Sequence, residues 1–208
     1  MTKKLDFATS IIHARECGTL NDVLPSGSEI PITFSNGEKS VLIVGRDKNH
    51  TYLIMRDTYK RHYCMNWGWS NYGGWPACNM RKYVQRFYEM LPESIRKIIV
   101  PMHIIQYVDN EIVECEDFAF LLSSVNVFGD SAFPFKLTQA DDLDSTQIDV
   151  FCSQKNRVKC RDRDNEASEW WLRSPYYMES FCTVYKDGSP HAVKAGRECG
   201  IVVAFCIE

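Results

Sequence analysis

The side chains best suited to chemistry are scattered along this sequence of 208 residues. The five histidines, His13, His50, His62, His103 and His191, are isolated, and none is evidently paired with a nucleophile. No G-x-S-x-G, Walker loop, G-x-G-x-x-G or H-E-x-x-H pattern occurs. The sequence therefore favours a protein without catalytic activity.

Cysteine is frequent, with nine residues in the chain. None forms a C-x-x-C pair, so neither a zinc ribbon nor a thioredoxin-type redox site is indicated. Cys182 and Cys206 lie in apolar runs, where a reduced cysteine packs as a small hydrophobic residue. We expect mostly reduced, buried thiols formed in a reducing cytoplasm, and a disulfide framework is the alternative.

Two acidic stretches could supply oxygen ligands to calcium. Neither follows an EF-hand loop or the Glu-Pro-Asn triplet of calcium-dependent lectins, so solvated loops are favoured and no cofactor is predicted beyond this candidate calcium. The residues are Asp141, Asp142, Asp144, Asp162, Asp164, Asn165 and Glu166.

A basic run has a positive charge at every second position, at Lys155, Arg157, Lys159, Arg161 and Arg163. This spacing would place all five on one face of a strand. That face could meet an anion or a nucleic acid, but a solvated strand face is favoured. The net charge is -3, so no global basic field exists and no nucleic-acid partner is expected.

Three tryptophans, Trp67, Trp69 and Trp75, stand in a segment rich in asparagine and glycine. Their rings could form a platform on which a sugar stacks. A packed loop beneath the following helix is the favoured interpretation.

The elements that must position these residues begin with a helix up to Gly18 and three strands at 30–34, 41–45 and 51–55. Asn36-Gly37 marks a hairpin turn between the first two strands. Apolar residues then recur at helical spacing from Met80 to Leu91, a helix that Asn79 can cap. A short helical turn follows Pro92, with three isoleucines directed inward.

The second half of the chain predicts short strands and loops. Strands are expected at 104–108, 118–122, 170–172, 181–185 and 201–207, with a hairpin turn at Asp187-Gly188. A loop-rich stretch covers 129–145. This order predicts an α+β fold rather than a parallel βαβ sheet.

Length and composition predict one folded domain, here residues 25–208, preceded by a helical extension at residues 1–24. Hydrophobic residues make up 45% of the chain, as in globular proteins. No apolar run reaches the roughly 20 residues that a membrane helix needs, so no membrane insertion is expected. We find no secretory signal and expect synthesis in the cytoplasm, with association with a virion as one destination.

Several short motifs together resemble a known family. Asn71-Tyr72-Gly73-Gly74-Trp75, residues 117–123 (DFAFLLS), residues 170–175 (WWLRSP) and the closing 200–205 (GIVVAF) are similar to an uncharacterised domain family of gut bacteria and phages, domain of unknown function 6273. That family resembles C-type-lectin-like folds, including the variable binding proteins that retroelements diversify.

The resemblance implies a fixed scaffold and a display surface in the C-terminal part of the chain. The scaffold would contain Trp170, Trp171, Leu172, Arg173, Ser174, Phe181, Val184, Gly188, Gly200 and Phe205. The ligand-binding residues would be Tyr176, Tyr177, Met178, Glu179, Tyr185, Lys186, His191, Val193, Lys194, Arg197 and Glu198. Tyrosine covers a large contact area at low rotamer entropy, and arginine is enriched among the residues that dominate binding energies.

The expected function is therefore non-catalytic binding of a cell-surface protein or glycan, as an adhesin or receptor-binding protein of a phage or mobile element. A structural virion component that assembles through this fold, with a homo-oligomer as one form, is an alternative. The other alternative is a thiol enzyme of the formylglycine-generating type, in which Cys199 would be the reactive residue.

Overall fold

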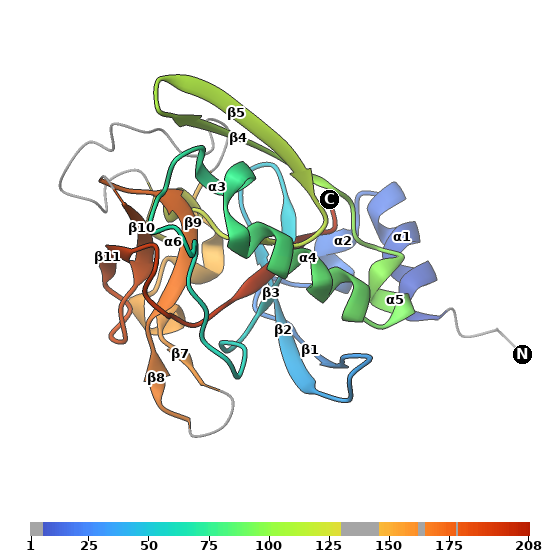
Figure 1. Ribbon diagram of the computed structural model, residues 1–208. Coiled ribbons are helices and arrows are strands. Elements are labelled where there is room, and N and C mark those ends of the chain that lie inside the picture. The colour runs from blue at the N-terminus through green and yellow to red at the C-terminus, as the bar shows by residue number, and fades with distance from the viewer. Residues whose placement is uncertain (1–5, 130–145, 162–164, 178) are drawn as a thin grey trace, which may run out of the picture.

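The computed structural model describes residues 6–129, 146–161, 165–177 and 179–208, and it shows a mixed α+β fold (Figure 1). Every ladder between named strands in these ranges is antiparallel. The α+β class expected from the sequence is confirmed. No helix in the described part of the chain is long and apolar enough to cross a membrane.

A five-stranded sheet lies at the centre of the molecule, in the order β1-β2-β3-β12-β6. Its strands are β1 (Glu29–Thr33), β2 (Lys39–Arg46), β3 (Thr51–Met55), β6 (Phe120–Leu121) and β12 (Val203–Cys206). The expected meander of three strands is confirmed, and Gly37 in its first turn has a φ of +84°, which glycine adopts without strain. Strand β12 enters between β3 and β6, so the start and the end of the chain share one sheet.

The helix with the clearest periodicity is α4 (Asn79–Met90). Met80, Val84 and Phe87 are its buried residues, and Phe87 packs edge-on against Phe34, which follows β1. The expected cap is wrong by one residue, because the Cys78 sulfur accepts the Arg81 N–H at 3.4 Å. Two short helices flank α4, namely α3 (Gly74–Ala77) and α5 (Glu93–Arg96).

The segment before β1 forms α1 (Phe7–Glu16) and α2 (Leu20–Val23). Ile11 is buried in the same core as the central sheet. The Arg15 guanidinium donates to the Ile207 carbonyl at 3.1 Å, which ties α1 to the segment after β12. These helices therefore pack on the body of the molecule.

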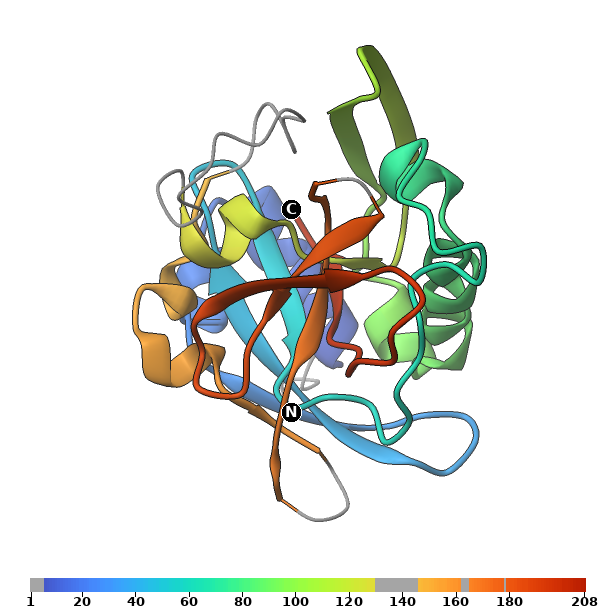
Figure 2. The ribbon, with the colours of Figure 1, turned by 60° about the vertical axis from the view of Figure 1, so that its left-hand side comes forward.

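Strand β5 (Glu111–Asp117), which pairs with β4 (Met102–Val108), is not among the expected strands, and three further strands nearer the C-terminus are not among them either. Asp109 and Asn110 have positive φ angles and make the tight turn of this hairpin. The strand expected at 118–122 is correspondingly shorter and begins only at Phe120. The β4–β5 hairpin projects from the body in both views (Figures 1 and 2).

After α6 (Ser124–Phe128), the chain forms the 3-10 turns η1 (Asp149–Phe151) and η2 (Gln154–Arg157) and the short strands β7 (Lys159–Cys160) and β8 (Ala167–Ser168). The expected solvated strand face of five basic residues is therefore wrong for Lys155, Arg157 and Lys159. Lys155 and Arg157 lie in a 3-10 turn, and Lys159 is buried. Alternate spacing puts residues on one face only where the backbone is extended.

A three-stranded sheet, in the order β11-β10-β9, closes the fold. Its strands are β9 (Trp170–Pro175), β10 (Ser180–Val184) and β11 (Pro190–Lys194). All ten predicted scaffold residues are buried. Arg173 donates to the Leu121 carbonyl at 2.5 Å, in agreement with its expected structural role. The C-terminal part of the chain thus has a rigid interior.

Candidate functional site

The segment at residues 65–73 is an irregular loop that hydrogen bonds hold at both ends. The Asn66 side chain accepts the Asn79 N–H at 2.7 Å and donates to the Ser70 carbonyl at 2.6 Å. The Asn66 backbone N–H donates to the Ala195 carbonyl at 3.1 Å. One asparagine therefore joins this loop both to the start of α4 and to the turn after β11.

Asn71 joins the other end of the loop to the three-stranded sheet. Its side-chain nitrogen donates to the Tyr176 carbonyl at 2.6 Å and to the Ser180 carbonyl at 3.1 Å. The asparagine is buried. Because buried amide hydrogen bonds have few alternative partners, the loop and the β9–β10 turn are positioned together.

The tryptophans at 67, 69 and 75 have different environments, the first two in this loop and the third in α3. Trp75 is fully buried, and its indole N–H donates to the Asp117 carboxylate at 2.7 Å. Trp67 is 79% exposed and Trp69 is 53% exposed. The packed-loop interpretation is confirmed for Trp75 and is wrong for the other two, whose rings face solvent.

The inner face of the Trp69 ring rests on Gly196. A Cβ atom built on Gly196 would lie 2.7 Å from the indole, so only glycine lets the ring approach this closely. The ring is therefore held in place from below while about half of its surface faces solvent.

Tyr72, at 74%, and Tyr177, at 67%, are the other highly exposed rings of these two neighbouring segments. We call the exposed side chains of Trp67, Trp69, Tyr72 and Tyr177 the aromatic surface. Single exposed rings are common on protein surfaces, whereas clusters of large exposed apolar side chains mark interaction sites. Trp and Tyr are also the residues that most often dominate binding energies.

Six predicted binding residues come together beside the aromatic surface. Tyr177 belongs to it, and Tyr176 is half-buried with its carbonyl bonded to Asn71. The exposed Lys194 ammonium lies 3.5 Å from the Glu179 carboxylate. Exposed Arg197 and Glu198 follow in the turn after β11. This end of the sheet thus combines exposed rings with charges of both signs.

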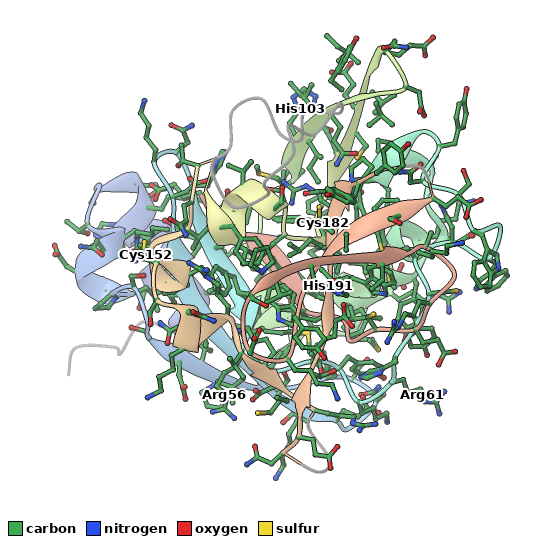
Figure 3. All side chains as sticks on the ribbon, turned by 90° about the vertical axis from the view of Figure 1, so that its left-hand side faces the viewer. Arg56, Arg61, His103, Cys152, Cys182 and His191 are labelled. Atoms are coloured by element: carbon green, nitrogen blue, oxygen red, sulfur yellow. The ribbon has the colours of Figure 1, made fainter. Side chains whose placement is uncertain are left out.

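Three predicted binding residues lie near the opposite end of the β10–β11 hairpin. Tyr185, Lys186 and His191 are exposed there, and His191 is labelled near the centre of the view in Figure 3. His191 is fixed by the buried Glu169 carboxylate, 2.7 Å from its Nδ1 atom, and by the edge of the Tyr185 ring. The expected surface is therefore split into two groups.

Two predicted binding residues lie apart from both groups. Val193 is wrong as a contact residue, because its side chain is buried beneath the sheet, directly opposite Phe181. Alternation along β11 turns it inward between the exposed side chains at the ends of the strand. Met178 lies outside the described residues.

The two thiols nearest the C-terminus are poorly suited to nucleophilic chemistry. All nine cysteines are among the described residues and have free thiols. Burial raises the pKa of Cys199 to about 12 and that of Cys206 to about 11, so both keep their protons near neutral pH. Ser168 lies 3.0 Å from the His62 ring but is buried and also bonded to the Glu169 carbonyl. This pair therefore fits a structural role.

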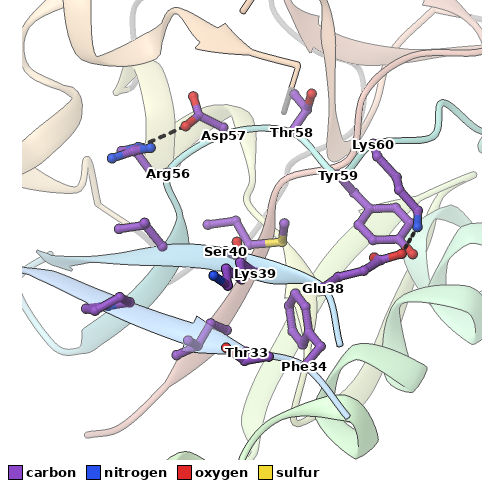
Figure 4. A pocket seen from close by; sticks show the side chains of 14 residues that line it. Thr33, Phe34, Glu38, Lys39, Ser40, Arg56, Asp57, Thr58, Tyr59 and Lys60 are labelled. Atoms are coloured by element: carbon purple, nitrogen blue, oxygen red, sulfur yellow. Dashed lines mark hydrogen bonds and ion pairs between the residues drawn. The ribbon is translucent and has the colours of Figure 1, made fainter. Parts of the chain in front are cut away.

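A cavity of about 430 Å³ opens where the β1–β2 hairpin diverges from the chain after β3 (Figure 4). Four of its charged side chains form two ion pairs. Lys60 meets Glu38 at one end, and Arg56 donates to Asp57 at the other at 2.8 Å. No cluster of metal-ligating side chains occurs among the described residues, and most of the candidate calcium ligands lie outside them.

Comparison with known proteins identifies one match. A family model described as "Domain of unknown function (DUF6273)" matches residues 49–208, which is more than half of the chain. No curated protein and no solved structure matches the chain. The matched region contains the whole aromatic surface and β12, whereas α1, α2, β1 and β2 precede it. The chain belongs to the family of this uncharacterised domain.

Proposed function

We propose that the protein is a non-catalytic binding module that presents the aromatic surface to a protein or glycan on a cell surface. A C-type-lectin-like scaffold, carried by a phage or mobile element, is part of this proposal. The observation that carries it is the pair of exposed indoles, Trp67 and Trp69, in a loop fixed by buried hydrogen bonds.

Rigid exposed rings support binding because they have little conformational entropy left to lose. Trp69 rests on Gly196, and the loop is bonded to α4 and to the sheet, so a ligand would meet a preformed surface. The flanking charges of Glu179, Lys194 and Arg197 supply polar contacts at the rim. The surface is open rather than enclosed, which favours a large ligand over a small molecule.

The proposal is tested by capture from bacterial envelope extracts on immobilised protein, in calcium and in chelator. Two variants separate the two groups of predicted residues. Trp67→Ala with Tyr177→Ala removes two rings of the aromatic surface, and Tyr185→Ala with Lys186→Ala alters the opposite end. Ile112→Ala, on the exposed β4–β5 hairpin, is the matched control.

We expect the first variant to lose at least about tenfold in captured ligand, because interface tryptophans commonly contribute 2 kcal/mol or more. The control and the second variant should capture as the wild type does. Loss only in the second variant would move the site to His191 and Tyr185. Absence of any capture, together with self-association in sedimentation, would favour the structural virion component instead.

A further inference from the structure

A second cavity, of about 370 Å³, lies between the central sheet and the η1–η2 segment. Ile43 and Ile54, which pair across β2 and β3, line it from the sheet, and Val150 and Phe151 line it from η1. Lys155 and Lys159 also line it. The cavity thus combines apolar side chains from the sheet and from η1 with charged ones, namely the two lysines together with Arg56, Asp57 and Glu29.

Lys159 is only 3% exposed, which is unusual for this residue type. An ammonium group has three donor hydrogens, but the one hydrogen bond that Lys159 makes to the described residues goes to the Met55 carbonyl at 3.5 Å, well beyond the usual N–H···O distance of about 2.9 Å. The Phe151 ring, 5.4 Å from Nζ, adds a weak cation–π contact. Within the described part of the chain, this buried amine therefore has one distant acceptor for its three donor hydrogens.

Within the described residues, the nearby carboxylates accept no hydrogen bond from Lys159. Arg56 donates to Asp57 at 2.8 Å and to Glu29 at 3.4 Å, so both acids are engaged by the guanidinium. Among the described residues, no carboxylate lies within ion-pair distance of Lys155 or Lys159. The charges that face the cavity therefore leave one net positive charge, carried by the lysines.

We propose that this cavity binds a small organic carboxylate with an apolar body, whose carboxylate accepts hydrogen bonds from Lys159. The isoleucines, Val150 and Phe151 would bury the apolar part. Lys155, exposed on η2, would draw the anion toward the opening. This site lies apart from the aromatic surface and does not depend on the function proposed for it.

The test is a titration with hexanoate, followed through the NMR methyl signals of Ile43 and Ile54, with hexanol as the uncharged probe of equal length. We expect hexanoate to bind at least about tenfold more tightly than hexanol, because the charge-assisted hydrogen bond is made only by the carboxylate. In Lys159→Met, an apolar replacement of similar length, this preference should vanish. In the control, Lys155→Met, it should persist.

A second measurement uses only the wild-type protein. Burial lowers the pKa of Lys159 to about 8, with Asp57 raising it and Arg56 lowering it further. A carboxylate binds the protonated amine, so hexanoate affinity should be constant between about pH 6, where hexanoate is still ionised, and about pH 8, and fall roughly tenfold per pH unit above this range. Three outcomes would overturn the proposal: no methyl shift with hexanoate, an unchanged preference in Lys159→Met, or an affinity independent of pH.

Discussion

The aromatic surface and the Lys159 cavity are opposites in construction. At the surface, apolar rings lie in water, and in the cavity a charged amine is almost fully buried. Both arrangements cost free energy in the unbound protein, because apolar surface is exposed to water in one and a charge is removed from water in the other. The difference between them concerns the ligand: the open surface suits a large partner, and the enclosed amine suits a small anion.

The largest expected effect is a difference in stability between a variant of Trp75, in α3, and a variant of Trp67, in the preceding loop. Trp75→Ala should lower the free energy of unfolding by about 3–5 kcal/mol, because it leaves a core cavity and removes the hydrogen bond to Asp117. Trp67→Ala should change it by less than about 0.5 kcal/mol, because that ring is exposed. Chemical denaturation of both variants measures the contrast. Equal losses would show that the exposed ring also stabilises the fold.

The next effect is expected at the cavity, where the substitution should stabilise the protein. Lys159→Met should raise the free energy of unfolding by about 1–3 kcal/mol near pH 7, since it removes a poorly paired buried charge. The folded pKa of about 8 is below the ordinary value of 10.5, so between these values the unfolded wild type binds more protons. The cost of burying the Lys159 charge therefore decreases with pH over this range, and the free energy of unfolding of the wild type increases by the same amount.

The advantage of Lys159→Met over the wild type should accordingly shrink from about pH 8 to about pH 10.5. Urea denaturation of both proteins at several pH values measures this difference, and the comparison cancels the titration of the thiols, which is common to both. A constant advantage would place the amine in a more solvated position than the structure shows.

A smaller effect is expected where the loop joins the sheet. Asn71→Ala removes the donors to the Tyr176 and Ser180 carbonyls and should lower the free energy of unfolding by about 1–2 kcal/mol. It deletes no exposed ring, yet ligand capture should weaken because the loop loses its anchor. Thermal melting and the capture assay check the two effects. Unchanged capture would mean that the rings need no anchoring.

The smallest effect is expected for the ion pair beside the aromatic surface. Lys194→Ala should change the free energy of unfolding by less than about 0.5 kcal/mol, because both Lys194 and Glu179 are exposed. Captured ligand should fall mainly at low salt, where rim charges act over a longer range. A large loss of stability would show that the pair supports the turn after β11.

Much of the fold follows from local patterns in the sequence. The Asn36-Gly37 turn, the apolar spacing of α4 and the turn at Gly188 each dictate their own geometry. Strand β5 escaped prediction because its side chains are mostly polar and exposed, so no core face marks it. Its one local signal was the Asp109-Asn110 turn, whose residues tolerate positive φ.

The candidate sites were harder to foresee, because burial is a property of the assembled fold. The outward position of Trp67 and the inward position of Trp75 depend on contacts with distant residues, such as Asp117. Lys159 belonged to a basic run that looked like a solvated strand face, and only the packing of η1 on the sheet encloses it. Predicted contacts such as Tyr177 were exposed as expected, since they occupy turns.

The position of β12 has a consequence for synthesis. This strand fills the gap between β3 and β6, and its backbone pairs with both. A ribosome releases β3 long before β12, so the nascent chain holds an apolar sheet with an open edge until residue 206 emerges. The core can therefore close only after translation of this region, and truncation before Val203 should leave an aggregation-prone chain rather than a smaller folded one.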